Sequence, residues 1–293
     1  MKRFLEHQWC VAGLLVGPAL IFLMAFTHWP AVRTIWSSFH STPRGKREAV
    51  YVGLENYGTM LADDVFWKVL GNTVWYAVLT VPASMALALV MALWVNDKIR
   101  GVGFLRLAFF TPTVLPLIAV GNLWLFFYTP GFGLIDQFRS LFGLASQTWV
   151  GSPETSLYAM SAITVWKEAG FFMIFYLAAL QAIPPVLREA AAIEGASPLQ
   201  FFLRVTVPLL MPTTLFVSVN ALINSFRLVD HIVMITQGGP DHASTVLFYY
   251  IYEMAFTYWD TAYAATLTVV MLGLLMVIGL GQVLLFDRRI HYK

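Results

Sequence analysis

The chain has 293 residues, of which 59% are hydrophobic and 12% charged, and its mean hydropathy is +0.71. A soluble domain carries about 25% charged residues, so this composition excludes an ordinary water-soluble fold and predicts a membrane protein. The net charge of +2 comes without a basic tract for nucleic acid, the single Cys10 excludes a disulfide framework, and the 6 histidines lack the spacing of metal ligands.

Six segments are long and apolar enough to be membrane-spanning helices, which need about 20 mostly apolar residues. They cover residues 9–29, 69–95, 107–128, 156–183, 205–226 and 262–286. Only helices satisfy their own backbone hydrogen bonds in lipid, so we predict an all-α membrane protein that forms one transmembrane domain over residues 1–293. The first segment exceeds the apolar core of a signal peptide and lacks a cleavage site after it, so we expect it to be retained.

The lysines and arginines of the loops predict the orientation. With six spans, both termini lie on the same side of the membrane. That side carries Lys2, Arg3, Lys98, Arg100, Arg106, Arg188, Arg204, Arg288, Arg289 and Lys293, and the opposite side carries Arg33, Arg44, Lys46, Arg47, Lys68, Arg139 and Arg227. Cytoplasmic loops are enriched in these residues, so both termini and the loop 184–204 are predicted to be cytoplasmic.

That loop contains the stretch "IPPVLREAAAIEGASPLQFF" (183–202). Two prolines suit a first helical turn, the alanine-rich stretch 187–194 is a strong helix former, and Gly195 can end the helix in a left-handed conformation. Ser197, followed by a proline and by Gln200, is typical of a new helix start with a capping box. The sequence thus predicts a slim helix, a glycine turn and a second helix; an ordinary interfacial connector is the alternative.

The longer stretch "EAAAIEGASPLQFFLRVTVPLLMP" (189–212) resembles the EAA signature of permease subunits in binding-protein-dependent type I ABC importers. The residues Glu189, Ala190, Ala191, Gly195 and Pro208 match the signature in place. Valines stand where Ile and Leu are usual, and Glu194 replaces the more frequent Asp. "VGLENY" (52–57), "LAALQAIP" (177–184) and "ITQGGP" (235–240) are similar to the carbohydrate-uptake branch, and within it to the larger maltose permease and the A-type glycerol-3-phosphate permease.

The resemblance implies an ATP-driven importer for a sugar or a glycerol-3-phosphate-like solute in the bacterial cytoplasmic (inner) membrane. The helix between spans four and five is then a coupling helix that docks into a cleft on a cytoplasmic ATPase. Its coupling residues are Glu189, Ala190, Ala191, Glu194 and Gly195. The implied partners are a second permease subunit, two ATP-binding subunits and an external solute-binding protein, periplasmic or lipid-anchored. ATP and Mg would bind the partner ATPase, and this chain would bind no cofactor.

Catalytic chemistry is not expected in this chain. The only Gly-Lys pair, Gly45-Lys46, has His40 where a P-loop needs its first glycine and Arg47 where it needs Ser or Thr. No nucleophile and base pair can be proposed, so we expect a non-enzymatic subunit without a metal site. A secondary transporter and a membrane-embedded sensor or enzyme are alternatives; the first usually shows inverted repeats, and the second needs paired carboxylates or histidines within the spans.

Polar residues inside the spans are candidates for the substrate pathway, because they are costly in lipid. The candidates are Trp166, Lys167, Glu168, Asn220, Asn224 and Arg227. Adjacent residues do not face each other on a helix, so the adjacent lysine and glutamate are predicted to have separate partners. The alternatives are structural pairing or snorkelling for the lysine, hydrogen bonds between helices for the asparagines, and packing for the tryptophan.

Overall fold

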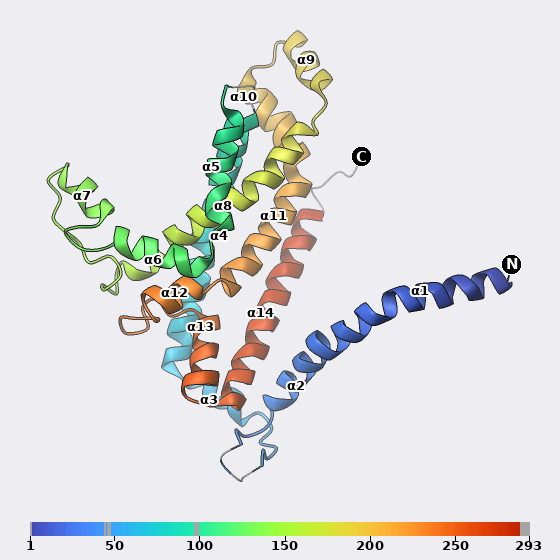
Figure 1. The fold of residues 1–293 in the computed structure, drawn as a ribbon, viewed down its shortest axis with the longest axis vertical. Coiled ribbons are helices and arrows are strands. Elements are labelled where there is room, and N and C mark those ends of the chain that lie inside the picture. The colour runs from blue at the N-terminus through green and yellow to red at the C-terminus, as the bar shows by residue number, and fades with distance from the viewer. Residues whose placement is uncertain (1, 44, 46–47, 97–99, 288–293) are drawn as a thin grey trace. The chain divides into compact units, whose positions relative to one another are not determined.

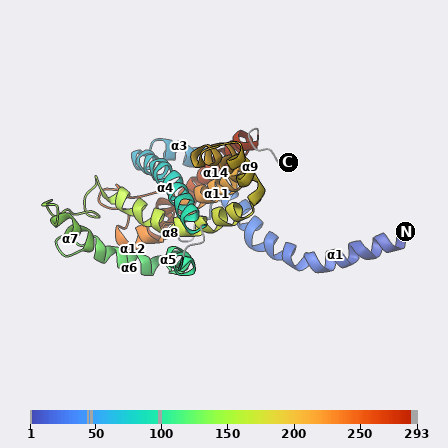
Figure 2. The same cartoon turned by 90° about the horizontal axis from the view of Figure 1, so that it is seen from above.

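A computed structural model describes residues 2–43, 45, 48–96 and 100–287. These ranges are almost entirely helical (Figure 1, and from above Figure 2), and within them the only β pairing is an isolated bridge between His40 and Tyr51. The prediction of an all-α protein is confirmed. Seven of the residues that predicted the orientation, and two of those compared with a P-loop, lie outside the described ranges. They are Arg44, Lys46, Arg47, Lys98, Arg288, Arg289 and Lys293.

The helices follow one another along the chain with short connections. Their bounds are α1 (Lys2–Leu23), α2 (Trp29–Ser37), α3 (Glu55–Leu61), α4 (Asp64–Asn96), α5 (Val102–Val114), α6 (Leu117–Phe127), α7 (Leu134–Ser140), α8 (Ser156–Gln181), α9 (Pro185–Ile193), α10 (Pro198–Phe201), α11 (Val207–Arg227), α12 (Asp230–Ile235), α13 (Leu247–Tyr252) and α14 (Thr261–Asp287). Single π-helical turns lie at Met24–His28, Phe202–Thr206 and Glu253–Thr257.

Five continuous helical stretches in the described part of the chain are long and apolar enough to cross a membrane. They are Cys10–Ser37, Asp64–Asn96, Ser156–Gln181, Pro198–Ile235 and Thr261–Leu284. The bent pair formed by α5 and α6 raises the number to six if the pair is one span. This confirms a multi-pass membrane protein with five of the predicted spans, and it changes the third.

The predicted span 107–128 is not an uninterrupted helix. It consists of α5 and α6, which are bent by 102° relative to each other at the break between Val114 and Leu117. Pro116 has no N–H for the carbonyl of Pro112, and its ring clashes with that carbonyl in a straight helix. Leu115, which precedes the proline, has φ −69° and ψ 134°, the extended backbone that this position favours. The proline therefore divides an apolar run into two half-helices.

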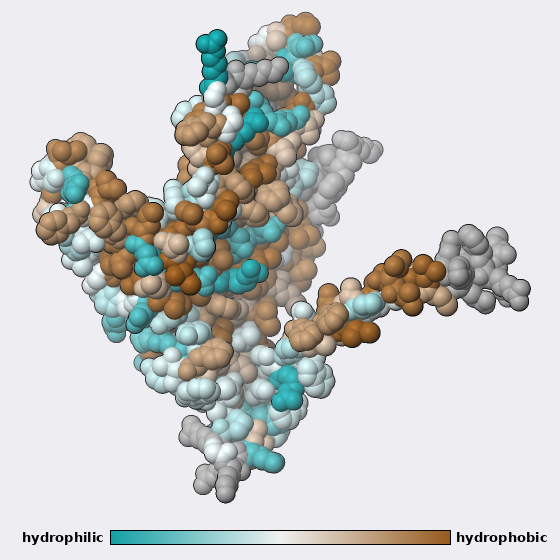
Figure 3. All heavy atoms as spheres, in the orientation of Figure 1, coloured by the Kyte–Doolittle hydropathy of each residue, from teal (hydrophilic) through white to brown (hydrophobic). Residues whose placement is uncertain are grey.

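The chain divides into two compact units. The first comprises Met1–Asp63 and Ile251–Leu272, and the second comprises Asp64–Tyr250 and Gly273–Lys293. The single domain expected from the sequence remains a prediction. In the first unit the apolar helix that begins at Cys10 has none of its most apolar stretch buried, and Figure 3 shows apolar side chains along it. A helix of this kind is suited to lipid or to another membrane-embedded chain.

The second unit has its core between α4 and α8. One cluster of buried side chains surrounds Tyr76 and Met160, and another surrounds Phe172 and Tyr176. Gly170 on α8 permits the close approach of α5, because a Cβ atom at this glycine would lie 2.1 Å from the carbonyl oxygen of Phe109. Helix α8, which carries three of the candidate pathway residues, is thus the central helix of this unit.

Candidate functional site

The segment 184–202 forms the predicted helix, glycine turn and helix. Helix α9 begins with Pro185 in its first turn and ends at Ile193, with Glu194 as its C-cap. Gly195 has φ +77° and donates its N–H to the Ala192 carbonyl at 3.1 Å, and Ala196 donates to Ala191 at 2.9 Å. These two bonds are a Schellman motif, which requires a left-handed residue after the C-cap and satisfies the last carbonyls of the helix.

Helix α10 begins at a complete capping box. The Ser197 hydroxyl accepts from the backbone N–H of Gln200 at 3.3 Å, and the Gln200 side chain accepts from the backbone N–H of Ser197 at 2.8 Å. Both bonds satisfy donors that a helix N-terminus otherwise leaves unpaired. The predicted local structure is confirmed, and α9 is connected to α10 by a turn with defined geometry at both ends.

The outer face of α9 is an exposed apolar stripe with one carboxylate. Val186 is 62% exposed and Ile193 is 88% exposed. Glu189 and Ala190 lie between them along the helix and are also exposed. Helix α9 lies at one extremity of the second unit in Figure 1. Such a face suits a protein partner with an apolar cleft and a basic residue.

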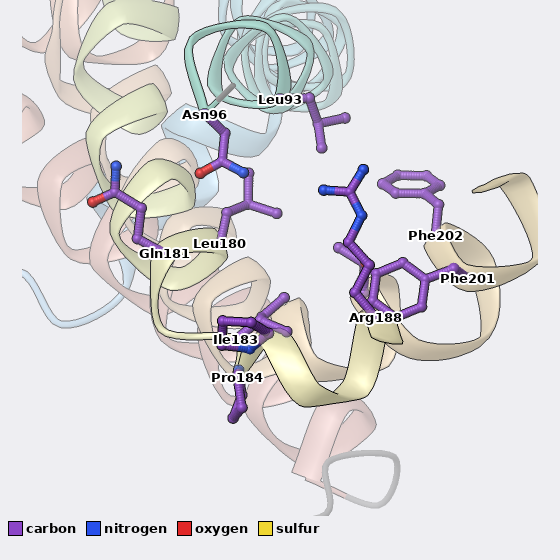
Figure 4. Close-up of a pocket in the computed structure, with 11 residues that line it drawn as sticks. Leu93, Asn96, Leu180, Gln181, Ile183, Pro184, Arg188, Phe201 and Phe202 are labelled. Atoms are coloured by element: carbon purple, nitrogen blue, oxygen red, sulfur yellow. The ribbon is translucent and has the colours of Figure 1, made fainter. Parts of the chain in front are cut away.

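The inner side of α9 borders a cavity of about 680 Å³. The ends of α4 and α8, the end of α10 and the π-helical turn after it complete the wall, with Leu93, Asn96 and Gln181 among the lining residues. Figure 4 shows the Arg188 side chain extending into this cavity beside Phe202. The two faces of α9 therefore differ, because the outer face carries a carboxylate and the inner face a guanidinium group.

Lys167 is buried, and within the described residues its ammonium group donates to three backbone carbonyls. It bonds to the carbonyl oxygens of Pro112 at 3.0 Å, Thr113 at 3.2 Å and Leu115 at 2.7 Å. All three carbonyls lie at the end of α5, where the third span bends. Three bonds use the three donors of an ammonium group.

Glu168 has a different partner on a different helix. The side-chain amide of Asn224, on α11, donates to Glu168 Oε2 at 2.6 Å. The predicted separation of partners for the adjacent lysine and glutamate is confirmed. Two of the candidate pathway residues are thereby brought together, and α8 is connected to α11 within the membrane-spanning region.

The remaining pathway candidates have other partners or none of the bonds of this pair. Trp166 packs edge to face against Trp124, with ring centroids 5.6 Å apart. The Asn220 amide donates to the Phe216 carbonyl one turn earlier at 2.8 Å. Arg227 is exposed at the end of α11. Asn220, Asn224 and Arg227 share one face of α11 by their spacing.

A buried polar cluster was not predicted from the sequence. The Tyr76 hydroxyl lies 2.5 Å from Thr164 Oγ1 and 3.1 Å from His231 Nε2, and all three side chains are buried. The cluster connects α4, α8 and α12. The sequence hints at this cluster only through Thr164, a polar residue one turn before Glu168. No local pattern connects Tyr76 with His231, because they are 155 positions apart. Within the described residues, no group of three or more His, Cys, Asp or Glu side chains could bind a metal ion.

The sequence matches, over residues 84–292, a family described as the binding-protein-dependent transport system inner membrane component. The chain belongs to this family. The matched range of the permease includes α9 and α10, so the resemblance seen in the EAA segment is confirmed. Permease proteins of transport systems are also among its curated relatives.

Two of these relatives are similar over almost their whole length. The sulfoquinovosyl glycerol transport system permease protein of Agrobacterium fabrum is 32% identical over 91% of this permease and 87% of its own length. The sn-glycerol-3-phosphate transport system permease protein of Escherichia coli is 31% identical over 96% of this permease and 95% of its own length.

The fold has solved counterparts. A chain of a bacterial ABC transporter involved in the import of the acidic polysaccharide alginate has a TM-score of 0.85 and 23% identity, with 98% of both chains covered. A chain from that kind of transporter in complex with an alginate pentasaccharide-bound periplasmic protein has a TM-score of 0.83 and 23% identity, with 96% of this permease and 95% of that chain covered. The fold is therefore that of an ABC importer permease.

Proposed function

We propose that this permease couples ATP hydrolysis by partner subunits to the import of a sugar or a glycerol-3-phosphate-like solute by alternating access. The observation that carries the proposal is the exposed face of α9. This helix ends in a Schellman motif, and the next helix begins at a capping box directly after the turn. The names of the relatives support the solute class.

The coupling step follows from the way α9 is connected to α11. Val186 and Ile193 would be buried in a cleft on an ATPase subunit, and Glu189 would pair with a basic residue there. Helix α10, the π-helical turn Phe202–Thr206 and α11 form one helical stretch. Movement of the ATPase would therefore displace α9 and, through α10, tilt α11.

The solute pathway is proposed to follow the face of α11 that carries Asn220, Asn224 and Arg227, with Glu168 opposite Asn224. Amides and carboxylates bond hydroxyl groups, and Arg227 suits an anionic group such as a phosphate. Trp166 and Lys167 would support this face from α8 through their packing and backbone contacts.

The proposed assembly contains a second permease subunit, two ATP-binding subunits that bind ATP and Mg, and an external solute-binding protein, periplasmic or lipid-anchored. One chain with five or six spans provides half of a pathway, which is the reason for the second permease. The family description supports a binding protein and the bacterial inner membrane. Both termini are proposed to be cytoplasmic.

Gentle solubilisation and affinity purification of the tagged permease tests the coupling role. An ATPase subunit is expected to co-purify with the wild type and to be lost from Glu189→Lys, because the reversed charge repels the basic residue of the cleft. Glu154→Lys, which makes the same change on an exposed loop, should retain the ATPase. Purification of the wild-type permease without any ATPase would favour a secondary transporter. Equal retention of the ATPase by both variants would contradict docking through Glu189.

Uptake measurements test the solute class. Cells that express the whole transport system are given labelled sn-glycerol 3-phosphate or labelled maltose as probes. If the solute is anionic, Arg227→Gln should reduce uptake of the phosphate probe at least tenfold, which corresponds to about 1.4 kcal/mol. If the wild type takes up neither probe above background, these two solutes are excluded.

A further inference from the structure

The bend in the third span creates an unsatisfied helix end inside an apolar run. An α-helix leaves its last carbonyls without intrahelical donors, and Pro116 removes the N–H that would pair with the Pro112 carbonyl. No water is available in a hydrocarbon layer to supply the missing bonds. The end of α5 therefore requires a donor from another helix.

Lys167 supplies such donors from α8. Its ammonium group lies 3.0 Å from the Pro112 carbonyl oxygen, 3.2 Å from that of Thr113 and 2.7 Å from that of Leu115. The Pro112 carbonyl is the one that the proline deprives of a partner, and Leu115 is the extended residue of the bend. A cation is also favoured at a helix C-terminus by the helix dipole.

The contact between α5 and α8 is reinforced in the opposite direction. The Thr113 hydroxyl donates to the backbone carbonyl of Lys167 at 3.3 Å. One turn further along α8, Gly170 has no side chain that would prevent the approach of the Phe109 backbone. The lysine is thus placed at the bend by close helix packing, and its charged group is directed at the carbonyls.

We infer that Lys167 is a positioning residue that replaces the backbone donors removed by Pro116 and thereby fixes the angle between α5 and α6. Helix α6 in turn packs against α12, where a Cβ atom at Gly121 would lie 3.5 Å from the Met234 side chain. Helix α12 directly follows α11, which carries Asn224 and Arg227. The role of Lys167 in transport rests on the proposed function, but its role at the bend does not.

Spin labels on the two arms of the bend measure the angle. Phe104 on α5 and Phe126 on α6 are both exposed and can be replaced by cysteine in a Cys10→Ser background. Each arm is about 16 Å long at about 1.5 Å per residue, so a bend of 102° separates the labelled positions by about 20 Å and a straight pair by about 33 Å. Electron–electron double resonance on the full chain in lipid nanodiscs resolves these distances.

The expected result is a short distance in the wild type and a shift of the Lys167→Met population toward the long distance, because methionine donates no hydrogen bond. Lys167→Arg retains both donors and charge and should restore the short distance. An unchanged distance distribution in Lys167→Met would overturn the inference. If that variant does not insert into the membrane, Lys167→Gln decides, because its two shorter-reaching donors should give a mixture of both distances and a wild-type distribution would overturn the inference.

Lys68→Met is the matched control. Lys68 pairs with the exposed Asp241 at 2.7 Å, and within the described residues its ammonium group bonds to Asp241 rather than to α5 or α6, so its loss should leave the distance unchanged. An equal shift in Lys68→Met and Lys167→Met would overturn the specific role of Lys167. The measurement uses neither solute nor ATP. A chain that transports nothing would refute the proposed function and leave the bend assignment intact.

Discussion

The pair of Glu168 and Asn224 shows how a carboxyl group is accommodated within an apolar helix. Glu168 is only 7% exposed, and Asn224 donates to it at 2.6 Å. Burying a carboxylate without a hydrogen-bond partner costs much free energy, and burying an unpaired neutral amide at the same position costs less. The stability of this contact therefore depends on both residues together.

Asn224→Ala should lower the free energy of unfolding by roughly 1–3 kcal/mol, because it leaves the buried carboxylate without its donor. The double variant Asn224→Ala with Glu168→Gln should recover part of this loss. Thermal unfolding of the purified protein in detergent measures both. Asn220→Ala is the matched change one turn earlier, where the amide bonds only the Phe216 carbonyl in the contacts described. A loss in Asn220→Ala as large as in Asn224→Ala would contradict the assignment.

Asp136 organises the loop around α7. Its carboxylate accepts from the backbone N–H of Gly131 at 2.9 Å, from the Ser146 hydroxyl, and from Trp149 Nε1 at 3.3 Å. The Gly131 bond and then the Ser146 bond lower the pKa of Asp136 below its ordinary value. The charged form is the one that the loop stabilises.

The loop should therefore keep its structure from neutral pH down to the ordinary carboxyl pKa of about 3.9 and lose it as the pH falls further. A carboxyl group whose pKa is lowered by folding stabilises the folded loop at pH values above its unfolded-state pKa. This stabilisation is lost when the carboxylate is protonated. The backbone N–H of Gln147 also donates to this carboxylate at 3.3 Å, so Asp136→Asn should show faster amide exchange at Gln147 already at neutral pH. Glu154→Gln, an exposed carboxyl on the same loop, should exchange as the wild type does; protection in Asp136→Asn equal to wild type would contradict the role of the carboxylate.

At the scale of helices, the contact between α5 and α8 depends on one glycine. A Cβ atom at Gly170 would lie 2.1 Å from the Phe109 carbonyl oxygen, which is a backbone atom and cannot rotate away. The helices must separate to admit a methyl group. Both the packing and the hydrogen bonds from Lys167 would then be weakened.

Gly170→Ala should reduce the free energy of unfolding by about 1–3 kcal/mol, as overpacking of a close contact does. Gly103→Ala is the matched control on α5, because a Cβ atom there meets nothing within 4 Å. That variant should be neutral or slightly stabilising, since alanine favours helices. Thermal unfolding of both variants measures the difference, and similar midpoints would show that the contact is looser than the structure indicates.

Over the whole molecule, the excess of lysine and arginine on one side predicts that both termini are cytoplasmic. Green fluorescent protein fused after residue 293 should be fluorescent. Alkaline phosphatase fused within the loop 129–155 should be active, because that loop is predicted to be external. An active phosphatase at the C-terminus would reverse the orientation.

Sequence reasoning located the spans because each is a long apolar run, and it located the turn at Gly195 because glycine, serine and proline there each have a specific conformational preference. It did not find the bend at Pro116, since leucines and valines around the proline read as one span. It left the role of Lys167 open because its acceptors are backbone carbonyls, which every residue has. The contact of Tyr76 with His231 depends on tertiary packing over 155 positions and has no local pattern.

The bend in the third span also bears on how the chain enters the membrane during synthesis. The carbonyls of α5 are translated first, and Lys167 follows Leu115 by 52 positions. Until α8 emerges and inserts, neither half-helix is long enough to cross the bilayer alone, and the end of α5 lacks its donor. With a cysteine in place of Phe126 in the Cys10→Ser background, we therefore expect nascent chains arrested before residue 167 to leave that position accessible to cysteine reagents. Chains long enough for all of α8 to have left the ribosome should protect it.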